Sequence, residues 1–204
     1  MVSHAYRVAV FIDWQNAYRS ARRAFGMDNM PTEHGVFSPY RLALLLAAGN
    51  DRGSDGKLVR VEIHRGLPSS KRDRVGFAAN RRHSQAWVNE NREIVVPRLR
   101  PLRYPKGSSR PEEKGIDVQL ALSAVEHALT DKCEVAIIFS NDTDLIPAIE
   151  MVSRMSSTSH IETASWVSPT HNSRLRAKPP VFHHALPESV FRSVETPINY
   201  AHQV

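Results

Sequence analysis

Four aspartates carry the chemistry that this chain could perform. They are Asp13, Asp117, Asp142 and Asp144, and they stand in three short segments far apart in the sequence. Each segment places a carboxylate where an apolar strand is expected to end or a helix to begin, and in a parallel α/β sheet such positions lie along one edge. Carboxylates gathered there repel one another, and a hard divalent cation such as Mg²⁺ or Mn²⁺ is the usual counter-charge. The pattern predicts a metal-dependent enzyme that acts on phosphate.

Helix capping is the simpler explanation of each aspartate taken alone, because a carboxylate at a helix start accepts hydrogen bonds from backbone N–H groups. Asp142 and Asp144 follow the apolar run VAIIF together, however, and one helix needs only one cap. If Asp144 is the cap, Asp142 is free to face a metal. Asp13, Asp117 and Asp142 are therefore the firmer expected ligands, with Asp144 a cap or a shared ligand. Asn16, one turn after Asp13, would bind a metal-bound water or a phosphate, or would be an exposed helical residue.

Apolar runs and helical patterns alternate along the chain and define the elements that position these groups. Strands are expected over residues 7–12, 58–64, 93–97, 134–139 and 161–167, and helices over 16–25, 40–48, 72–91, 116–129 and 144–155. Residues 97–115 are rich in Pro and Gly and are expected to form a loop, and a short basic helix is expected over 172–177. The alternation predicts an α/β fold with a central, mainly parallel sheet of about five strands between two layers of helices.

The expected domain covers residues 1–170. Residues 171–204 form a C-terminal extension that either packs on the same domain or makes a homodimer contact.

A basic block lies next to these acids in the sequence. The net charge is +6, and residues 65–110 hold twelve Lys and Arg against three acidic residues, so that this block alone carries +9. A basic surface beside an acidic cluster suits a protein that holds a polyanion while the acids hold a metal; a solvated basic face is the alternative for the block alone. The candidate contacts to a nucleic-acid backbone are Arg72, Arg74, Arg81, Arg82, Arg100, Arg103 and Lys106.

Composition narrows the class further. Cys133 is the only cysteine, so we expect neither an intrachain disulfide nor a thiolate metal site. No run of eighteen or more apolar residues is present, and the first residues lack the pattern of a secretory signal. We expect a cytoplasmic protein that does not cross a membrane.

Three motifs resemble the NYN domain family, a branch of the PIN-like nucleases. They are FIDWQN at 11–16, EKGIDVQLAL at 113–122 and IIFSNDTDLIPAIE at 137–150. With the order of strands and helices, the resemblance covers roughly residues 6–168. Trp14 stands where the family often has a smaller residue, and Asn141 stands where Gly is frequent, but neither change removes an acid.

The resemblance implies a PIN-like α/β/α fold and an endoribonuclease that hydrolyses phosphodiester bonds with Mg²⁺ or Mn²⁺, with RNA favoured over DNA. It implies that Asp13, Asp117, Asp142 and Asp144 form the acid set beside Asn16. Ser140 and Lys114 also match motif positions and would contact nucleic acid, and Trp14 would either stack on a base or pack in the core.

Two other functions remain open. A non-catalytic RNA-binding or regulatory module would use the same fold without cutting. A phosphatase is disfavoured because Asp13 is followed by Trp14-Gln15 rather than by a second aspartate two residues on, and a phospho-relay receiver domain is disfavoured because Val96-Pro97 stands after the third strand, where it would need an aspartate.

Overall fold

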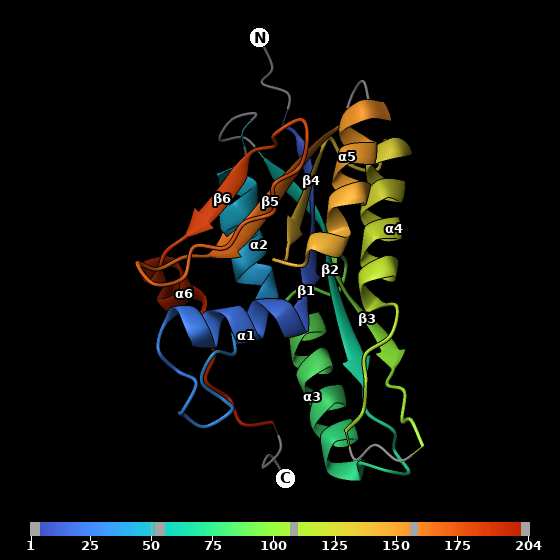
Figure 1. The fold of residues 1–204 in the computed structure, drawn as a ribbon, viewed down its shortest axis with the longest axis vertical. Helices are drawn as coiled ribbons and strands as arrows, with labels where there is room; N and C mark the ends of the chain where they lie inside the picture. Colours follow the sequence, from blue (N-terminus) through green and yellow to red (C-terminus); the bar gives the residue numbers. More distant parts are fainter. Residues whose placement is uncertain (1–4, 50, 52–55, 107–109, 156–158, 201–204) are drawn as a thin grey trace.

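A sheet of parallel strands runs through the middle of the protein (Figure 1). The computed structural model describes residues 5–49, 51, 56–106, 110–155 and 159–200. Within these ranges the six strands lie in the order β3-β2-β1-β4-β5-β6. They are β1 (Arg7–Asp13), β2 (Lys57–Leu67), β3 (Val95–Pro101), β4 (Val135–Phe139), β5 (His160–Trp166) and β6 (His183–Leu186). The direction of winding reverses between β1 and β4, and open parallel sheets bind ligands beyond the carboxyl ends of the strands at such a switch point.

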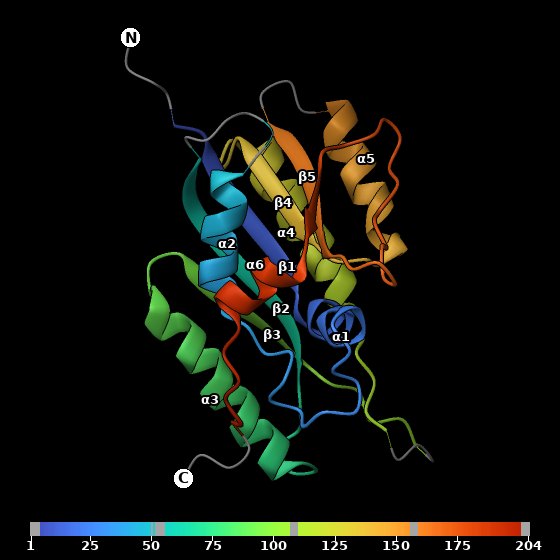
Figure 2. The ribbon, with the colours of Figure 1, turned by 90° about the vertical axis from the view of Figure 1, so that its left-hand side faces the viewer.

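Helices cover both faces of the sheet, which gives the predicted three-layer α/β/α arrangement (Figures 1 and 2). One face carries α2 (Pro39–Ala48), α3 (Arg74–Glu90) and α6 (Glu188–Val194), and the other carries α4 (Ile116–Leu129) and α5 (Ile146–Met155). The first helix, α1 (Trp14–Ala24), lies across the end of the sheet where β1 finishes. None of the helices in the described ranges is long and apolar enough to cross a membrane.

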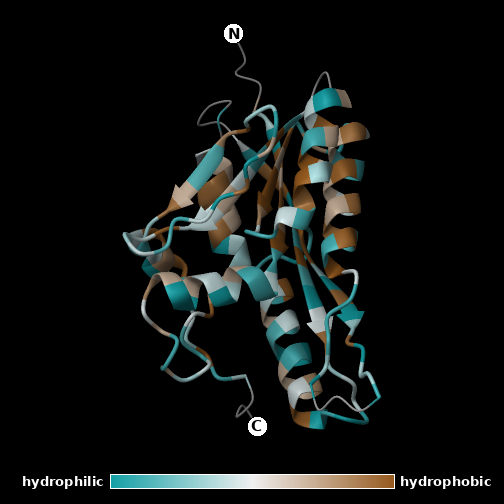
Figure 3. Ribbon diagram, in the orientation of Figure 1, coloured by the Kyte–Doolittle hydropathy of each residue, from teal (hydrophilic) through white to brown (hydrophobic). Residues whose placement is uncertain are grey.

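The central strand β1 shows why this sheet forms. Val8, Val10 and Ile12 belong to the core under α2, Ala9 and Phe11 belong to the core under α4, and all five are fully buried. A strand covered on both faces needs an apolar residue at nearly every position rather than at alternate ones. Figure 3 shows this as hydrophobic colour along the middle of the sheet.

The predicted end of the third strand at residue 97 is wrong. β3 continues to Pro101 and includes Pro97, so residues 97–101 belong to the sheet rather than to the loop. Proline has no N–H to give to a neighbouring strand, but β3 is the edge strand and pairs only with β2. An edge position tolerates proline because one side of the strand has no partner.

Two further expectations, near the C-terminus and after β4, need correction, and two elements were not predicted. Residues 172–177 form no helix; Leu175 and Ala177 instead bury their side chains in the core beside α5. The helix expected over 144–155 begins as a 3₁₀ turn, Thr143–Leu145, and becomes α-helical at Ile146. β6 and α6 were not predicted, and β6 extends the sheet by pairing with β5. The division of the chain at residue 170 stays a prediction.

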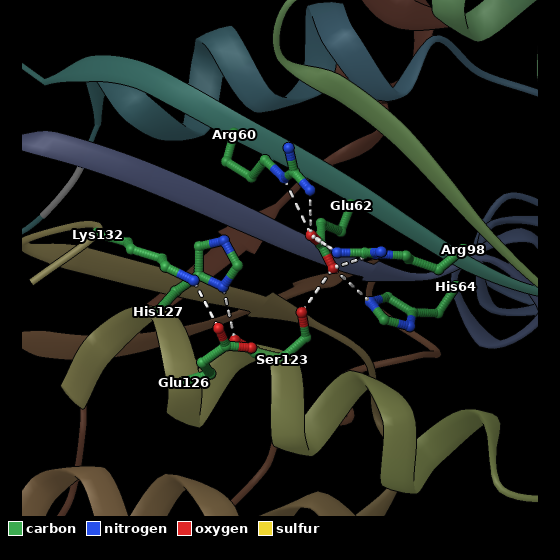
Figure 4. A network of polar contacts seen from close by, with 8 residues as sticks. All are labelled: Arg60, Glu62, His64, Arg98, Ser123, Glu126, His127 and Lys132. Carbon is green, nitrogen blue, oxygen red and sulfur yellow. Dashed lines mark hydrogen bonds and ion pairs between the residues drawn. The ribbon is translucent and has the colours of Figure 1, made fainter. Parts of the chain in front are cut away.

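A buried carboxylate ties β2, β3 and α4 together (Figure 4). Glu62 is fully buried and accepts hydrogen bonds from Arg60, Arg98 and Ser123 at 2.6–3.0 Å, while His64 lies 3.4 Å away. Burial acts to raise the pKa of Glu62, but the hydrogen bonds to its carboxylate outweigh burial and lower the pKa below its usual range. The network therefore holds a charged carboxylate inside the protein, and His64 has a structural place beside it.

Candidate active site at the carboxyl ends of β1 and β4

Asp13 is the last residue of β1 and also the N-cap of α1. Its Oδ1 accepts a hydrogen bond from the backbone N–H of Asn16 at 3.1 Å, and its Oδ2 accepts one from the Ser140 hydroxyl at 3.1 Å. Burial raises the pKa of Asp13 from 3.8 to about 6. The negative charges of Glu113 and Asp142 also raise this pKa, whereas the two hydrogen bonds lower it. A carboxyl group that titrates near neutrality is a common feature of active sites.

Polar contacts join the segment after β1 to the segment after β4. Ser140 follows β4, and its hydroxyl oxygen accepts a hydrogen bond from the backbone N–H of Asp142 at 3.1 Å while it donates to Asp13. The side-chain oxygen of Asn16 accepts from the backbone N–H of Asn141 at 3.0 Å. Asn16 and Ser140 thus hold the two acid-bearing loops together at the switch point.

The predicted division of roles between Asp142 and Asp144 is wrong in one respect. Asp142, not Asp144, is the cap: its Oδ1 accepts the backbone N–H of Asp144 at 3.0 Å at the start of the 3₁₀ turn. The cap falls two residues earlier because the helix begins as a tighter 3₁₀ turn. Asp144 is exposed, and only Asp142 of the pair lines the cleft beside Asp13.

The cleft has a volume of about 430 Å³, and both acidic and basic side chains line it. Asp13, Asp142 and Glu113 supply the carboxylates, and Arg19 and Arg23 supply two guanidinium groups from α1. Arg19 and Arg23 are both exposed on the helix that Asp13 caps. Such a lining can hold a cation at its carboxylates and a phosphate group at its guanidinium groups.

Glu113, Arg19 and Arg23 were not among the predicted site residues. Glu113 lies in the motif that suggested Asp117, and its Oε1 accepts the backbone N–H of Gly66 at 3.1 Å. Asp117 lies in the first turn of α4, and the residues that line the cleft do not include it. Lys114 borders a different hollow between β3 and α4, where Arg100 donates to its carbonyl oxygen at 2.8 Å. The structure brings together Asp13, Asn16, Ser140 and Asp142 from the predicted set.

The carboxylates of the cleft fit one type of metal site. Within the described part of the chain, no three His, Cys, Asp or Glu side chains are close enough together to hold a metal ion by themselves. Mg²⁺, however, is usually held by one or two carboxylates, while waters and substrate phosphates complete its octahedral shell. Asp13 and Asp142 fit an ion of that kind, shared with a substrate, and do not fit a cage made by protein alone.

The predicted basic contacts are spread over two regions. Arg74 and Arg81 are exposed on α3, and Arg72 lies over the Tyr104 ring, with 5.1 Å from its guanidinium carbon to the ring centroid. Arg82 donates two hydrogen bonds, of 3.0 and 2.6 Å, to the carbonyl oxygen of Tyr200, so it anchors the C-terminal segment. The others, Arg100, Arg103 and Lys106, are exposed on β3 and the residues after it.

The ring of Trp14 is almost wholly buried, so a base cannot stack on its face. Only 2% of its surface is exposed, and it packs against Phe37, His83 and Trp87 with ring centroids 4.6–4.9 Å apart. Of the two roles that the sequence allowed, the structure supports packing in the core. Trp14 follows Asp13 directly, so the packed ring also restrains the backbone at the acid.

The parallel sheet and its two covering layers of helices define a PIN-like α/β/α fold, and the cleft lies at the switch point of that sheet. The sequence model of the NYN domain matches residues 7–185, so the chain belongs to the NYN domain family. A solved structure of a protein of unknown function from Vibrio parahaemolyticus has a similar fold, with a TM-score of 0.53 and 17% identity over 83% of this chain and 89% of that chain.

One curated relative is known by its activity. It is 6-hydroxy-3-succinoylpyridine 3-monooxygenase of Pseudomonas putida, which is 46% identical over 70 residues. The match covers 32% of this chain and 22% of the relative's length. This chain therefore matches about one fifth of the relative's length, whereas the relative's name describes the whole of that protein.

Proposed function

We propose that the protein is a metal-dependent nuclease that hydrolyses phosphodiester bonds, and that its substrate is RNA. The observation that carries the proposal is the convergence of Asp13 and Asp142 at the switch point, in a cleft that Arg19 and Arg23 also line. A phosphodiester is an anion that arginine recognises through paired N–H groups. Family membership supports hydrolysis as the chemistry, and the choice of RNA over DNA rests on the family resemblance alone.

Each residue of the cleft has a distinct task in this proposal. Arg19 and Arg23 orient the phosphate group, and Asp13 and Asp142 hold the Mg²⁺ or Mn²⁺ ion. When bound, such an ion supplies a nucleophilic water and stabilises charge on the leaving oxygen. Ser140 and Asn16 act as positioning residues, because they fix the acid-bearing loops. Asp117, in the first turn of α4, and Asp144, in the 3₁₀ turn, would become ligands only if binding of substrate or metal moved these turns toward the cleft.

Cleavage of labelled RNA and DNA by the full chain, with Mg²⁺ or Mn²⁺ added, tests the proposal. We expect RNA to be cut, and we expect EDTA or Asp142→Asn to abolish cutting. Asp28→Asn is a matched control, since Asp28 is an exposed aspartate outside the cleft. Robust cleavage in the presence of EDTA, and by the Asp142→Asn variant, would contradict the proposed metal-dependent mechanism.

The alternative is a non-catalytic RNA-binding or regulatory module. It is supported by the exposed basic side chains on α3 and after β3, which would bind RNA without any metal. Binding that is unchanged by Asp13→Asn, with no cutting in Mn²⁺, would favour this alternative.

The relative in Pseudomonas putida suggests one more candidate, a monooxygenase acting on a pyridine ring. Oxygen insertion needs a reductant and a cofactor to activate oxygen. Consumption of oxygen that depends on 6-hydroxy-3-succinoylpyridine and on an added reductant would favour this activity over hydrolysis, and the same preparations used for RNA cleavage can be tested for it.

A further inference from the structure

A second hollow lies beside the acidic cleft, and aromatic side chains form part of its lining, together with Glu33 and Arg65. We call it the aromatic pocket; it has a volume of about 200 Å³, and Trp14, Tyr18, His83 and Tyr200 contribute rings to its lining. The rings come from α1, from α3 and from the C-terminal segment, which runs past α3 (Figures 1 and 2). Three segments distant in sequence thus converge on one pocket.

The rings lie in two nearly parallel pairs. Tyr200 stacks on His83 with centroids 4.2 Å apart and an angle of 16°, and Tyr18 lies at 17° to Trp14 with centroids 6.3 Å apart. Trp14 and His83 are buried and form the floor, while Tyr18 and Tyr200 are partly exposed. Exposed aromatic rings of this kind provide stacking surfaces for bases, which all have a π-face.

Arg65 gives the pocket a positive charge. Its guanidinium lies 5.7 Å from the ring centroids of Trp14 and Trp87 and is 3.1 Å from Nδ1 of His83. No ion pair engages Arg65 in the described part of the chain. Burial lowers the pKa of Arg65 to about 10, so it stays charged at neutral pH. The charge of Glu113 acts on Arg65 without forming an ion pair, so the guanidinium keeps N–H groups that can receive an anion.

The aromatic pocket is continuous with the acidic cleft. An intervening hollow of about 490 Å³ shares Gln15, Arg19 and Glu113 with the cleft, and shares Gln15 and Arg65 with the aromatic pocket. Gln15 lines all three. A chain of phosphates lying in the cleft would therefore pass Arg65 before its next base reaches the rings.

We propose that the aromatic pocket binds one unpaired nucleobase of a single-stranded nucleic acid, with Arg65 on the adjoining phosphate. The proposal rests on the proposed function, and it restricts the substrate to strands that have a free base beside the site of cutting. The pocket is smaller than the usual site for a drug-sized ligand, so it suits a group as small as one base. A base within a duplex is stacked and paired and cannot enter unless it is flipped out.

The pocket also has free hydrogen-bonding capacity. The Nε2 atom of His83 is buried and has no hydrogen-bond partner within the described residues. Burial and the nearby charge of Arg65 lower the pKa of His83 well below its usual value, so the ring is neutral. Gln15 adds a side-chain amide to the lining. In the orientation that satisfies its hydrogen bonds, its oxygen accepts from Arg19 at 2.9 and 3.0 Å, which leaves the NH₂ group to donate to a base edge.

Binding in EDTA tests the proposal without cleavage. Fluorescence anisotropy compares a short labelled single-stranded RNA with a blunt duplex of the same sequence. We expect the single strand to bind more tightly, and we expect Tyr200→Ala to weaken single-strand binding roughly tenfold, as loss of one stacked base does elsewhere. Arg65→Lys keeps the charge but loses the planar group, and should also reduce the preference for single strands.

Two control variants separate the pocket from general surface effects. Phe182→Ala removes a partly exposed aromatic ring near β6, and Arg154→Gln removes an exposed charge on α5. Both should leave the preference for single strands unchanged. Because Tyr200 is only half-buried, its variant remains informative even if Arg65→Lys fails to fold.

The outcomes separate this proposal from the nuclease proposal. Equal binding of single strand and duplex, or no effect of Tyr200→Ala, overturns the nucleobase pocket even if RNA is cut. Selective single-strand binding that persists in Asp13→Asn, with no cutting in any metal, retains the pocket and overturns the nuclease. Binding of 6-hydroxy-3-succinoylpyridine with no binding of RNA would assign the rings to a small heteroaromatic molecule instead and overturn the proposal.

Discussion

The hydroxyl group of Ser140 donates a hydrogen bond to the carboxylate of Asp13 over 3.1 Å, and this bond joins the ends of β1 and β4. It is one of the two hydrogen bonds that lower the pKa of Asp13 against the effect of burial. The same hydroxyl accepts the backbone N–H of Asp142. The Ser140 side chain thus lowers the pKa of Asp13 and also positions the backbone at Asp142.

The first prediction concerns Ser140→Ala. Without the hydroxyl, the pKa of Asp13 should rise above about 6, because burial then acts with less opposition. The acid limb of the pH–rate profile for cleavage should move to higher pH. Ser153→Ala, which removes a hydroxyl that donates to Ile149 within α5, should leave the profile in place. An unshifted acid limb in Ser140→Ala would show that Asp13 does not govern it.

The second prediction is that Asp13→Asn stabilises the protein while it abolishes cleavage. The pKa of Asp13 is raised in the folded state, from 3.8 to about 6. The unfolded chain therefore ionises first as the pH rises, and the folded state loses stability between about pH 4 and pH 6. Asparagine avoids this loss, so the variant should gain roughly 1–3 kcal/mol at neutral pH and little below pH 4.

Urea unfolding in EDTA at neutral and acid pH measures this difference. Asp28→Asn, at an exposed position, is the control and should show no comparable gain. If Asp13→Asn is equally or less stable at neutral pH, the Asp13 carboxylate is not strained by burial.

The third prediction concerns the buried network around Glu62. Glu62→Gln removes the charge that Arg60 and Arg98 share, and should destabilise the protein by on the order of 3 kcal/mol, as breaking other buried ion pairs does. Glu126→Gln is the matched control, because Glu126 is exposed and pairs with Lys132 at the surface; it should change stability little. Thermal unfolding at neutral pH compares the two. Similar melting temperatures for both variants would contradict the importance of the network.

The fourth prediction uses salt to count phosphate contacts. Each contact to single-stranded nucleic acid contributes about 0.7 to the slope of log affinity against log salt. If Arg19 and Arg23 each hold a phosphate, the double variant with both changed to Gln should reduce the slope by about 1.4. Arg154→Gln should leave the slope unchanged. Binding measured over a series of salt concentrations in EDTA gives the slopes, and identical slopes would remove these two arginines from the interface.

The place of Asp13 and Asp142 could be predicted because each follows a short apolar strand and precedes a helix. Parallel strands connected by helices bring such positions to one edge, so local pattern was enough. The place of Glu113 could not be predicted this way. It lies in an irregular segment, and its contact with the backbone of Gly66 depends on how that segment folds over β2.

Arg19 and Arg23 illustrate a signal that the sequence did contain. They lie three and seven residues after Asn16, which is the spacing of one face of a helix. Because Asn16 lines the cleft, the residues on the same face of α1 are brought to the cleft with it. β6 is a different case. Its four residues, HHAL, are too few to show a hydrophobic periodicity, and they form a strand only by pairing with β5.

The bond between Ser140 and Asp13 closes a span of 127 residues. Such a long-range contact forms only after most of the chain is present, because β4 must pair with β1 before the two loops can meet. During synthesis Asp13 leaves the ribosome long before Ser140 does. If the protein cuts RNA, as proposed, the incomplete chain would be unable to cleave the mRNA that encodes it or the ribosomal RNA during its own synthesis.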